Sequence, residues 1–200
     1  MTLIVENADE FCLEEIGKRV KGGETCIYPT ETCYGLGTNA LKEEAVEKIY
    51  EVKKRDRSKK LPCIVSSVEM AEKYCDLGVL EKKICKEFMP GPITIVASKK
   101  DSVPNLLNTD FVFRVPSDET ARMLVEKSGV PIVSTSANFS GARNNYRIED
   151  ISRILRDRID IIIDCGELDE NMPSTVVKVT GGKVEVLREG PIPEEKIKEL

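Results

Sequence analysis

The chain has 200 residues, with an apolar fraction of 40% and a charged fraction of 32%, which are ordinary values for a soluble globular protein. Its formal net charge is -5 and histidine is absent, so mechanisms that need a histidine base or a histidine metal ligand are excluded. The longest apolar runs are too short to span a bilayer, and the first residues lack the pattern of a signal peptide. We therefore expect a cytoplasmic protein without a membrane partner.

Strand and helix patterns alternate along the chain, which predicts an α/β fold. In chain order we expect a strand at 2–5, a helix at 8–23, a strand at 25–28, a loop at 29–39, a helix at 41–52, a strand at 61–66, short helices at 67–75 and 80–88, a turn at 89–92, strands at 93–98 and 111–116, a helix at 118–129, a strand entering a polar loop at 131–138, a helix at 148–158, a strand at 159–164, a hairpin of strands 174–179 and 183–190, and a helix at 193–200. The antiparallel hairpin makes the sheet mixed. No linker or repeat divides the chain, so we expect a single domain over 1–200.

Two patterns have simple interpretations. The seven cysteines include no CxxC pair, so a zinc site or a disulfide framework is disfavoured, and we expect no catalytic thiolate at Cys33. Helix 8–23 places Phe11, Leu13, Ile16 and Val20 at helical spacing, which predicts a buried face.

The segment YPTETCYGLGTNA contains the letters GxGxxA, but Pro29 and a polar stretch separate them from the preceding strand, so we reject a dinucleotide site. In an extended chain Thr30, Thr32 and Tyr34 point to one side and can line a small-molecule pocket. The simpler alternative is that these hydroxyls cap the following helix.

Six of the eight residues from Lys53 to Lys60 are cationic, in a chain of negative net charge. Their partner is a nucleic acid, a small polyphosphate or only water. Cations at the end of helix 41–52 complement the helix dipole, by about 0.3–1 kcal/mol each. If the helix ends near Val52 and the chain continues extended, Lys53 and Arg55 converge on one ligand, and such a pair suits a triphosphate.

Three further segments carry polar groups in apolar surroundings. In 111–116, Phe111, Phe113 and Val115 share one face, while Arg114 lies on the other and needs a partner, either Asp118 or a substrate carboxylate. The loop STSANFSG follows an apolar strand, where α/β sheets bind ligands, although an ordinary Ser/Asn turn is the alternative. Alternation in the last strand places Arg188 either inward or on an exposed edge.

Seven segments occur in one order from about Tyr28 to Arg188, over most of the chain: YPTETCYGLG, KKR, MPGPITIV, FRVP, STSANFSG, STVVKV and VLREGP. This series resembles the YrdC-like family of L-threonylcarbamoyladenylate synthases. The resemblance implies a single-domain YrdC-like twisted mixed sheet, flanked by helices, with an open concave ligand cleft. It also implies a reaction in which L-threonine, bicarbonate or CO2, and ATP give threonylcarbamoyl-AMP and pyrophosphate, the first step of threonylcarbamoyladenosine formation in tRNA.

The resemblance also assigns roles to residues. Lys53 and Arg55 match the family's KxR motif and are expected to be catalytic, and Ser136 and Asn138 match its SxN motif. The residues expected to bind ATP are Lys53, Arg55, Ser134, Ser136, Asn138 and Arg188. The residues expected to bind threonine are Thr32, Arg114 and Ser174. Ile64 stands where some relatives have a histidine near the amino acid. Mg²⁺ is expected to arrive with ATP, without an organic cofactor.

The implied partners are ATP, L-threonine, bicarbonate and a downstream tRNA N6-adenosine threonylcarbamoyltransferase. Two alternatives stay open. One is an RNA-binding module that uses the cationic run and the arginines of 143–158, although aromatic residues are only 5% of the chain. Weak contact with tRNA or double-stranded RNA is compatible with the enzyme. The other is a paralogue with the same fold and a different carbamoyl-adenylate substrate.

Overall fold

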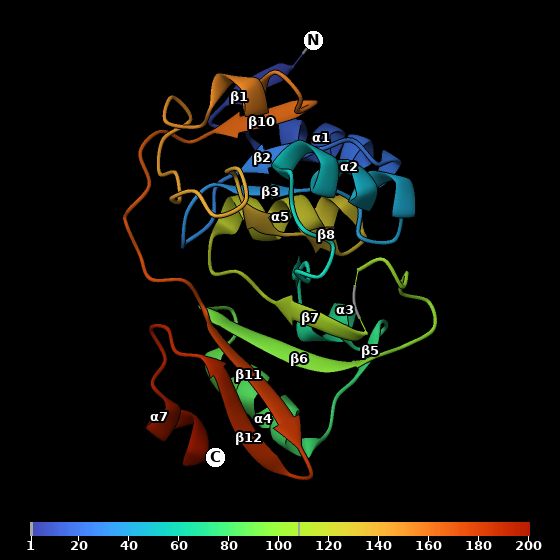
Figure 1. Cartoon of the computed structure of the whole chain (residues 1–200), viewed down its shortest axis with the longest axis vertical. Coiled ribbons are helices and arrows are strands. Elements are labelled where there is room, and N and C mark those ends of the chain that lie inside the picture. Colours follow the sequence, from blue (N-terminus) through green and yellow to red (C-terminus); the bar gives the residue numbers. More distant parts are fainter. Residues whose placement is uncertain (1, 108) are drawn as a thin grey trace.

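The computed structural model describes residues 2–107 and 109–200. Its strands form two sheets, which lie one above the other in Figure 1. The upper sheet has the strand order β1 (Leu3–Glu6), β10 (Ile161–Asp164), β2 (Cys26–Tyr28), β3 (Gly35–Gly37) and β9 (Thr135–Ser136). The lower sheet has the order β12 (Lys183–Arg188), β11 (Thr175–Thr180), β6 (Ile93–Lys99), β7 (Asp110–Arg114), β4 (Cys63–Ile64) and β8 (Ile132–Val133), with β5 (Cys75–Asp76) beside β6.

Both sheets are mixed. Strands β1, β10 and β2 are parallel, whereas β3 is antiparallel to both β2 and β9. In the lower sheet β11 and β6 are parallel, and the pairs β6–β7 and β11–β12 are antiparallel. The predicted class and the C-terminal hairpin are thus confirmed, but a single sheet was expected and two are present.

The helices flank these sheets. They are α1 (Glu10–Gly22), α2 (Glu43–Lys53), α3 (Val68–Ala71), α4 (Val79–Phe88), α5 (Glu119–Ser128), α6 (Arg153–Arg156) and α7 (Glu194–Lys198). A helix was predicted over 148–158, but only the four residues of α6 are α-helical in this segment. No helix of the described residues is long and apolar enough to cross a membrane.

Helices α1 and α5 pack on one face of the upper sheet. This core contains Leu13, Ile16 and Val20 from α1, Leu124 and Val125 from α5, and residues of β2 and β10. The helices approach so closely that a Cβ at Gly17 would lie 2.8 Å from the backbone of Lys127. Phe11, which we expected on the buried face, is 74% exposed, because at about 100° per residue it lies on the opposite side of α1 from Leu13 and Val20, which are buried.

The opposite face of the upper sheet joins a larger core. Ile27, Leu36 and Ile162 pack there with Val46 and Ile49 of α2, and this core continues into the lower sheet. The expected loop 29–39 contains strand β3, whose Gly37 lies so close to β8 that a Cβ there would approach the carbonyl oxygen of Val133 to 1.9 Å. The glycines of GLGTNA therefore permit close strand packing, in accord with our rejection of a dinucleotide loop.

Candidate active site

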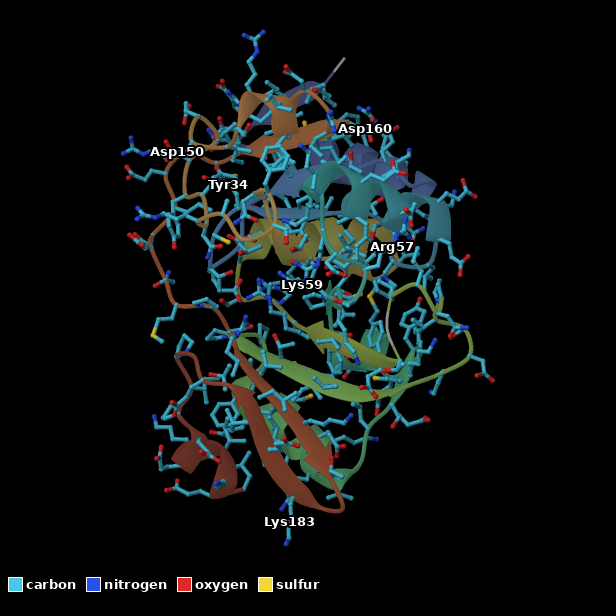
Figure 2. All side chains as sticks on the ribbon, viewed as in Figure 1. Tyr34, Arg57, Lys59, Asp150, Asp160 and Lys183 are labelled. Atoms are coloured by element: carbon cyan, nitrogen blue, oxygen red, sulfur yellow. The ribbon has the colours of Figure 1, made fainter. Side chains whose placement is uncertain are left out.

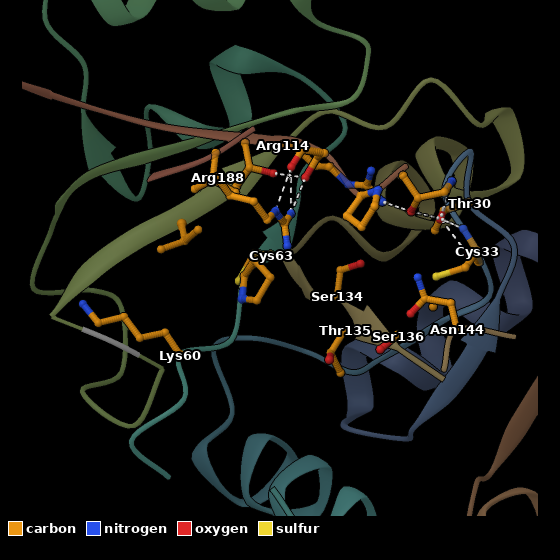
Figure 3. Close-up of a pocket in the computed structure, with 18 of the residues that line it drawn as sticks. Thr30, Cys33, Lys60, Cys63, Arg114, Ser134, Thr135, Ser136, Asn144 and Arg188 are labelled. Carbon is orange, nitrogen blue, oxygen red and sulfur yellow. Dashed lines mark hydrogen bonds between the residues drawn. The ribbon is translucent and has the colours of Figure 1, made fainter. Parts of the chain in front are cut away.

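A cavity of about 410 Å³ opens between the two sheets (Figure 3). Its lining includes four cationic side chains, those of Arg55, Lys60, Arg114 and Arg188. Seven hydroxyl side chains also line it, those of Thr30, Thr32, Thr94, Ser134, Thr135, Ser136 and Ser174. No aspartate or glutamate occurs among the described residues that line the cavity. This composition suits an anionic ligand that is held by charge and by hydroxyl groups.

The loop STSAN lies where the chain crosses from one sheet to the other. Strand β8 belongs to the lower sheet and β9 to the upper sheet, and Ser134 is the single residue between them. Its backbone N–H donates to the carbonyl oxygen of Pro62 at 2.8 Å, which fixes the crossing. Because of this crossing, the consecutive side chains of Ser134, Thr135 and Ser136 all border the cavity.

Lys53 is directed at this loop. The side chain is buried, and its Nζ donates to the carbonyl oxygens of Ser136 and Asn138, the latter at 2.7 Å, and to Asn138 Oδ1 at 3.1 Å. Neither Lys53 nor Asn138 lines the cavity. Burial, followed by the charge of Arg55, lowers the pKa of the Lys53 ammonium to about 7.

Arg55 does line the cavity, so Lys53 and Arg55 take different directions. The expectation that they converge assumed an extended chain. Instead α2 continues to Lys53, and Lys54 adopts a left-handed conformation with φ 50° and ψ 43°. The Arg55 guanidinium donates to the carbonyl oxygens of Lys59 and Lys60 at 3.2 and 2.7 Å, and burial lowers its pKa. The loop that follows the helix thus fixes Arg55 at the cavity wall.

The remaining cations of the run 53–60 have separate surroundings. Arg57 pairs with Glu47, while Lys60 approaches Asp110 at 3.5 Å and donates to the Thr109 hydroxyl at 3.0 Å. Lys59 is exposed and does not line the cavity; Figure 2 labels it in the region between the two sheets. The run is therefore not one continuous cationic surface.

The segment after β2 provides two of the three expected hydroxyls. Thr30 Oγ1 donates to the carbonyl oxygen of Cys33 at 2.6 Å and lies 3.0 Å from Thr32 Oγ1, and both threonines line the cavity. Tyr34 was expected beside them but is fully buried, and its hydroxyl donates to the carbonyl oxygen of Gly166 at 2.8 Å. None of these hydroxyls caps α2, whose N-cap residue makes no side-chain hydrogen bond.

Arg114 has an ion-pair partner that sequence reasoning missed. Its Nη1 lies 2.8 Å from Oε1 of Glu31, and Nη2 lies 3.5 Å from Thr32 Oγ1. Asp118, the structural partner we considered, instead caps α5 by accepting the N–H of Ala121 at 2.8 Å. The alternation in β7 is as predicted, since Phe111 and Phe113 are in the core whereas Arg114 faces the cavity.

Ser174 and Arg188 meet at the lower wall. The Arg188 guanidinium donates twice to the carbonyl oxygen of Ser174, at 3.0 and 2.8 Å, and once to its hydroxyl, at 3.1 Å. Thr94 Oγ1 lies 2.8 Å from the same hydroxyl. Arg188 therefore faces the cavity from an edge strand, and burial lowers its pKa. Thr94 was not predicted, although a polar residue inside the apolar strand 93–98 was an available signal.

Two cysteines line the cavity, Cys33 and Cys63. Burial raises the pKa of both thiols, that of Cys63 to about 12, which favours the protonated form. Ile64 packs in the core with α1 and α5, so the side chain of β4 that faces the cavity is that of Cys63.

The cavity thus brings together most of the expected site residues. Those that line it are Thr32, Arg55, Arg114, Ser134, Ser136, Ser174 and Arg188. Lys53 and Asn138 lie behind its wall. Sequence reasoning did not identify Glu31, Lys60, Thr94 or Asn144 as part of the site or its immediate support.

The sequence of the chain matches a family model described as telomere recombination, which carries the names Sua5, YciO and YrdC, over residues 18–190. The chain belongs to the Sua5/YciO/YrdC family. A putative threonylcarbamoyl-AMP synthase of Methanocaldococcus jannaschii is 37% identical over 92% of this chain and 88% of its own length. The threonylcarbamoyl-AMP synthase of Pyrococcus abyssi is 33% identical over the whole chain, which spans only 61% of that relative.

Solved structures of this family have the same fold. Pyrococcus abyssi Sua5 in complex with L-threonine superposes with a TM-score of 0.91 at 32% identity, covering all of this chain and 60% of that one. Escherichia coli YciO superposes with a TM-score of 0.85 at 24% identity, covering 99% of this chain and 98% of that one, and this likeness concerns the fold alone.

Proposed function

We propose that the chain is an L-threonylcarbamoyladenylate synthase. In this reaction the amine of L-threonine combines with bicarbonate or CO2 to give a carbamate. A carbamate oxygen attacks the α-phosphorus of ATP, pyrophosphate leaves, and threonylcarbamoyl-AMP is the product. The observation that carries the proposal is the cavity between the sheets, where four cations and seven hydroxyls face one space. The names of the relatives support the same activity.

The two substrates occupy different parts of the cavity wall. Arg114, Thr32 and Ser174 hold the amino acid, with the Arg114 guanidinium on its carboxylate. Arg55, Ser134, Ser136 and Arg188 face the nucleotide, and Arg55 and Arg188 neutralise its phosphates. Lys53 and Asn138 support this second surface from behind.

The chemistry needs no histidine, because it proceeds through charge and position. Pyrophosphate is a good leaving group once cations neutralise it, so no proton donor has to assist its departure. Fixed guanidinium and hydroxyl groups hold the carbamate in line with the α-phosphorus. A cationic lining also disfavours the ammonium form of the substrate, so the neutral amine, which is the nucleophile toward CO2, becomes more abundant.

Mg²⁺ enters as part of the substrate, bound to the phosphates of ATP. The described residues contain no group of three or more cysteine, aspartate or glutamate side chains that could hold a metal, and no carboxylate lines the described cavity wall. Phosphate oxygens and water are suitable Mg²⁺ ligands by themselves.

The product is a labile mixed anhydride of a carbamate and a phosphate, and a tRNA N6-adenosine threonylcarbamoyltransferase is the downstream partner in this proposal. Direct RNA binding is less well supported. In the arginine-rich segment 143–158, Arg147 pairs with Glu167, and Arg153 lies 3.5 Å from Asp157. These pairs reduce the charge that the segment offers to a phosphate backbone.

Pyrophosphate release tests the proposal. The enzyme is incubated with MgATP, and pyrophosphate is measured with threonine and bicarbonate added singly and together. Release that requires both co-substrates supports the synthase. Pyrophosphate release that requires neither co-substrate, or breakdown of ATP to ADP and inorganic phosphate with no pyrophosphate, contradicts it.

A further inference from the structure

Lys53, the last residue of α2, contacts the segment 136–140 through both its side chain and its backbone carbonyl. The side chain is 1% exposed, and its ammonium is surrounded by oxygens of Ser136 and Asn138. The carbonyl oxygen of Lys53 also accepts the N–H of Ser140 at 3.1 Å. The end of the helix is thus joined to the loop through both the backbone and the side chain.

All donors of the ammonium are used inside the protein. A lysine ammonium has three N–H groups, and Lys53 Nζ has three acceptors, which are two carbonyl oxygens and Asn138 Oδ1. A phosphate oxygen would have to replace one of these acceptors to contact Lys53 directly. The side chain is also absent from the cavity wall, whereas Arg55 lies in that wall.

Asn138 transmits this contact to the cavity. Its Oδ1 accepts the hydroxyl of Ser136 at 2.7 Å, and its Nδ2 donates to the carbonyl oxygens of Ala142 and Arg143, both at 2.8 Å. Ser136 lines the cavity, so Asn138 links the buried ammonium to a hydroxyl that faces the ligand. The side-chain amide of Asn138 therefore fixes both the Ser136 hydroxyl and the backbone of Ala142 and Arg143.

The acceptors around Lys53 are neutral. Burial lowers the pKa of Lys53 most, and the positive charge of Arg55 lowers it further. A buried cation without a carboxylate partner is costly for the free enzyme. A triphosphate bound on the other side of the loop would provide the missing negative charge.

We propose that Lys53 is a positioning residue, which holds the segment 136–140 in its ligand-binding conformation from behind and acts on the nucleotide through Asn138 and Ser136. The inference rests on the proposed function for the identity of the nucleotide. The arrangement of the loop itself is a property of the nucleotide-free protein, so it can be tested separately from activity.

Hydrogen exchange of the nucleotide-free protein tests the proposal. In Lys53→Met we expect backbone amides of 136–145 to exchange at least about tenfold faster than in the parent chain. Lys48→Met, a change at an exposed lysine of the same helix, serves as the matched control and leaves them unchanged. Unchanged protection in Lys53→Met, together with weaker ATP binding, would overturn the proposal in favour of direct contact.

A double-mutant cycle provides an independent readout. Lys53→Met, Asn138→Ala and the double variant are compared by the KM for ATP and by kcat. If Lys53 acts through Asn138, the double variant is no more impaired than the worse single variant, because both changes break one connection. If the two effects multiply, the residues act independently and the proposal is wrong.

A measurement on the parent chain covers the case in which Lys53→Met does not fold. The Lys53 side chain is titrated by NMR while the exchange of 136–145, corrected for the intrinsic effect of pH, is followed. We expect loop protection to fall as the ammonium loses its proton. Loop protection that is independent of this titration would overturn the proposal, whether or not the chain makes threonylcarbamoyl-AMP.

Discussion

Arg114 and Glu31 form an ion pair that involves only one of the two carboxylate oxygens of Glu31. Oε1 of Glu31 lies 2.8 Å from Nη1 of Arg114, whereas Oε2 is buried without a hydrogen-bond partner. Both side chains are largely withdrawn from solvent, at 10% and 16% exposure. The guanidinium proposed to bind the substrate carboxylate thus already contacts an internal carboxylate, and the two carboxylates compete for it or share it.

Glu31→Gln replaces the carboxylate that pairs with Arg114 by an uncharged amide. The amide keeps an acceptor but removes the charge that compensates Arg114, so we expect a loss of about 1–3 kcal/mol in the free energy of unfolding. Threonine would then supply the missing negative charge and should raise the melting temperature more in the variant than in the parent chain. Thermal unfolding with and without threonine measures both effects.

Glu167→Gln is the control for this experiment, because Glu167 pairs with the exposed Arg147 outside the cavity. It should leave the threonine-induced shift unchanged. A smaller shift in Glu31→Gln than in the parent chain would mean that Glu31 assists the amino acid rather than competing with it.

The cationic run allows a matched pair of substitutions. Arg55 lines the cavity, whereas Arg57, two residues later, is exposed and paired with Glu47. Arg55→Ala should lower kcat/KM for ATP by about 100-fold or more, because it removes a guanidinium from the triphosphate. Arg57→Ala should change it by less than about twofold. If both substitutions lowered kcat/KM for ATP equally in steady-state assays, the cationic run would act through its total charge rather than through a specific contact of Arg55.

Protonation of Lys53 should be linked to nucleotide binding. Its pKa is about 7 in the free protein because of burial, and a nearby triphosphate raises it. The complex then binds more protons than the free protein above that value. Affinity for ATP is therefore highest below about pH 7, falls as the pH rises from there to the raised pKa of the complex, and levels off above it.

Calorimetry in buffers of different ionisation enthalpy measures this linkage. At about pH 8, where the terminal phosphate of ATP is already ionised, we expect proton uptake on binding. Lys53→Met should abolish the uptake. Binding without proton uptake in the parent chain would contradict the assigned linkage.

Cys33 should not act as a nucleophile. It lines the cavity, but burial raises the pKa of its thiol, so the reactive thiolate is scarce at neutral pH. Cys33→Ser should retain activity within about threefold, as is usual for a packing change near a site. Loss of all product formation in a folded Cys33→Ser would contradict this view and point to a covalent role.

Local patterns predicted much of this fold. Alternation in 111–116 placed Arg114 on the side opposite the buried phenylalanines, and the glycine pair after 174–179 predicted the hairpin. Alternation failed for Tyr34, because β3 begins at the next residue and the tyrosine ring enters the core. It also failed after α2, where the left-handed Lys54 turns Lys53 and Arg55 apart.

Local sequence patterns did not predict contacts between segments that are far apart in the chain. Two sheets were not predicted, because short runs such as 131–138 do not show that their chain changes sheet at Ser134. The partner of Arg114 lies 83 positions earlier in the chain, and a single sequence contains no signal for that pairing. The identity of most cavity residues was available only through the ordered motifs and their resemblance to the YrdC-like family.

Mass spectrometry of the product formed from ATP, L-threonine and ¹³C-labelled bicarbonate tests the synthase activity directly. The expected product is threonylcarbamoyl-AMP that contains the labelled carbon, formed together with an equal amount of pyrophosphate. A product without the label, or an adenylate of threonine itself, would contradict this activity.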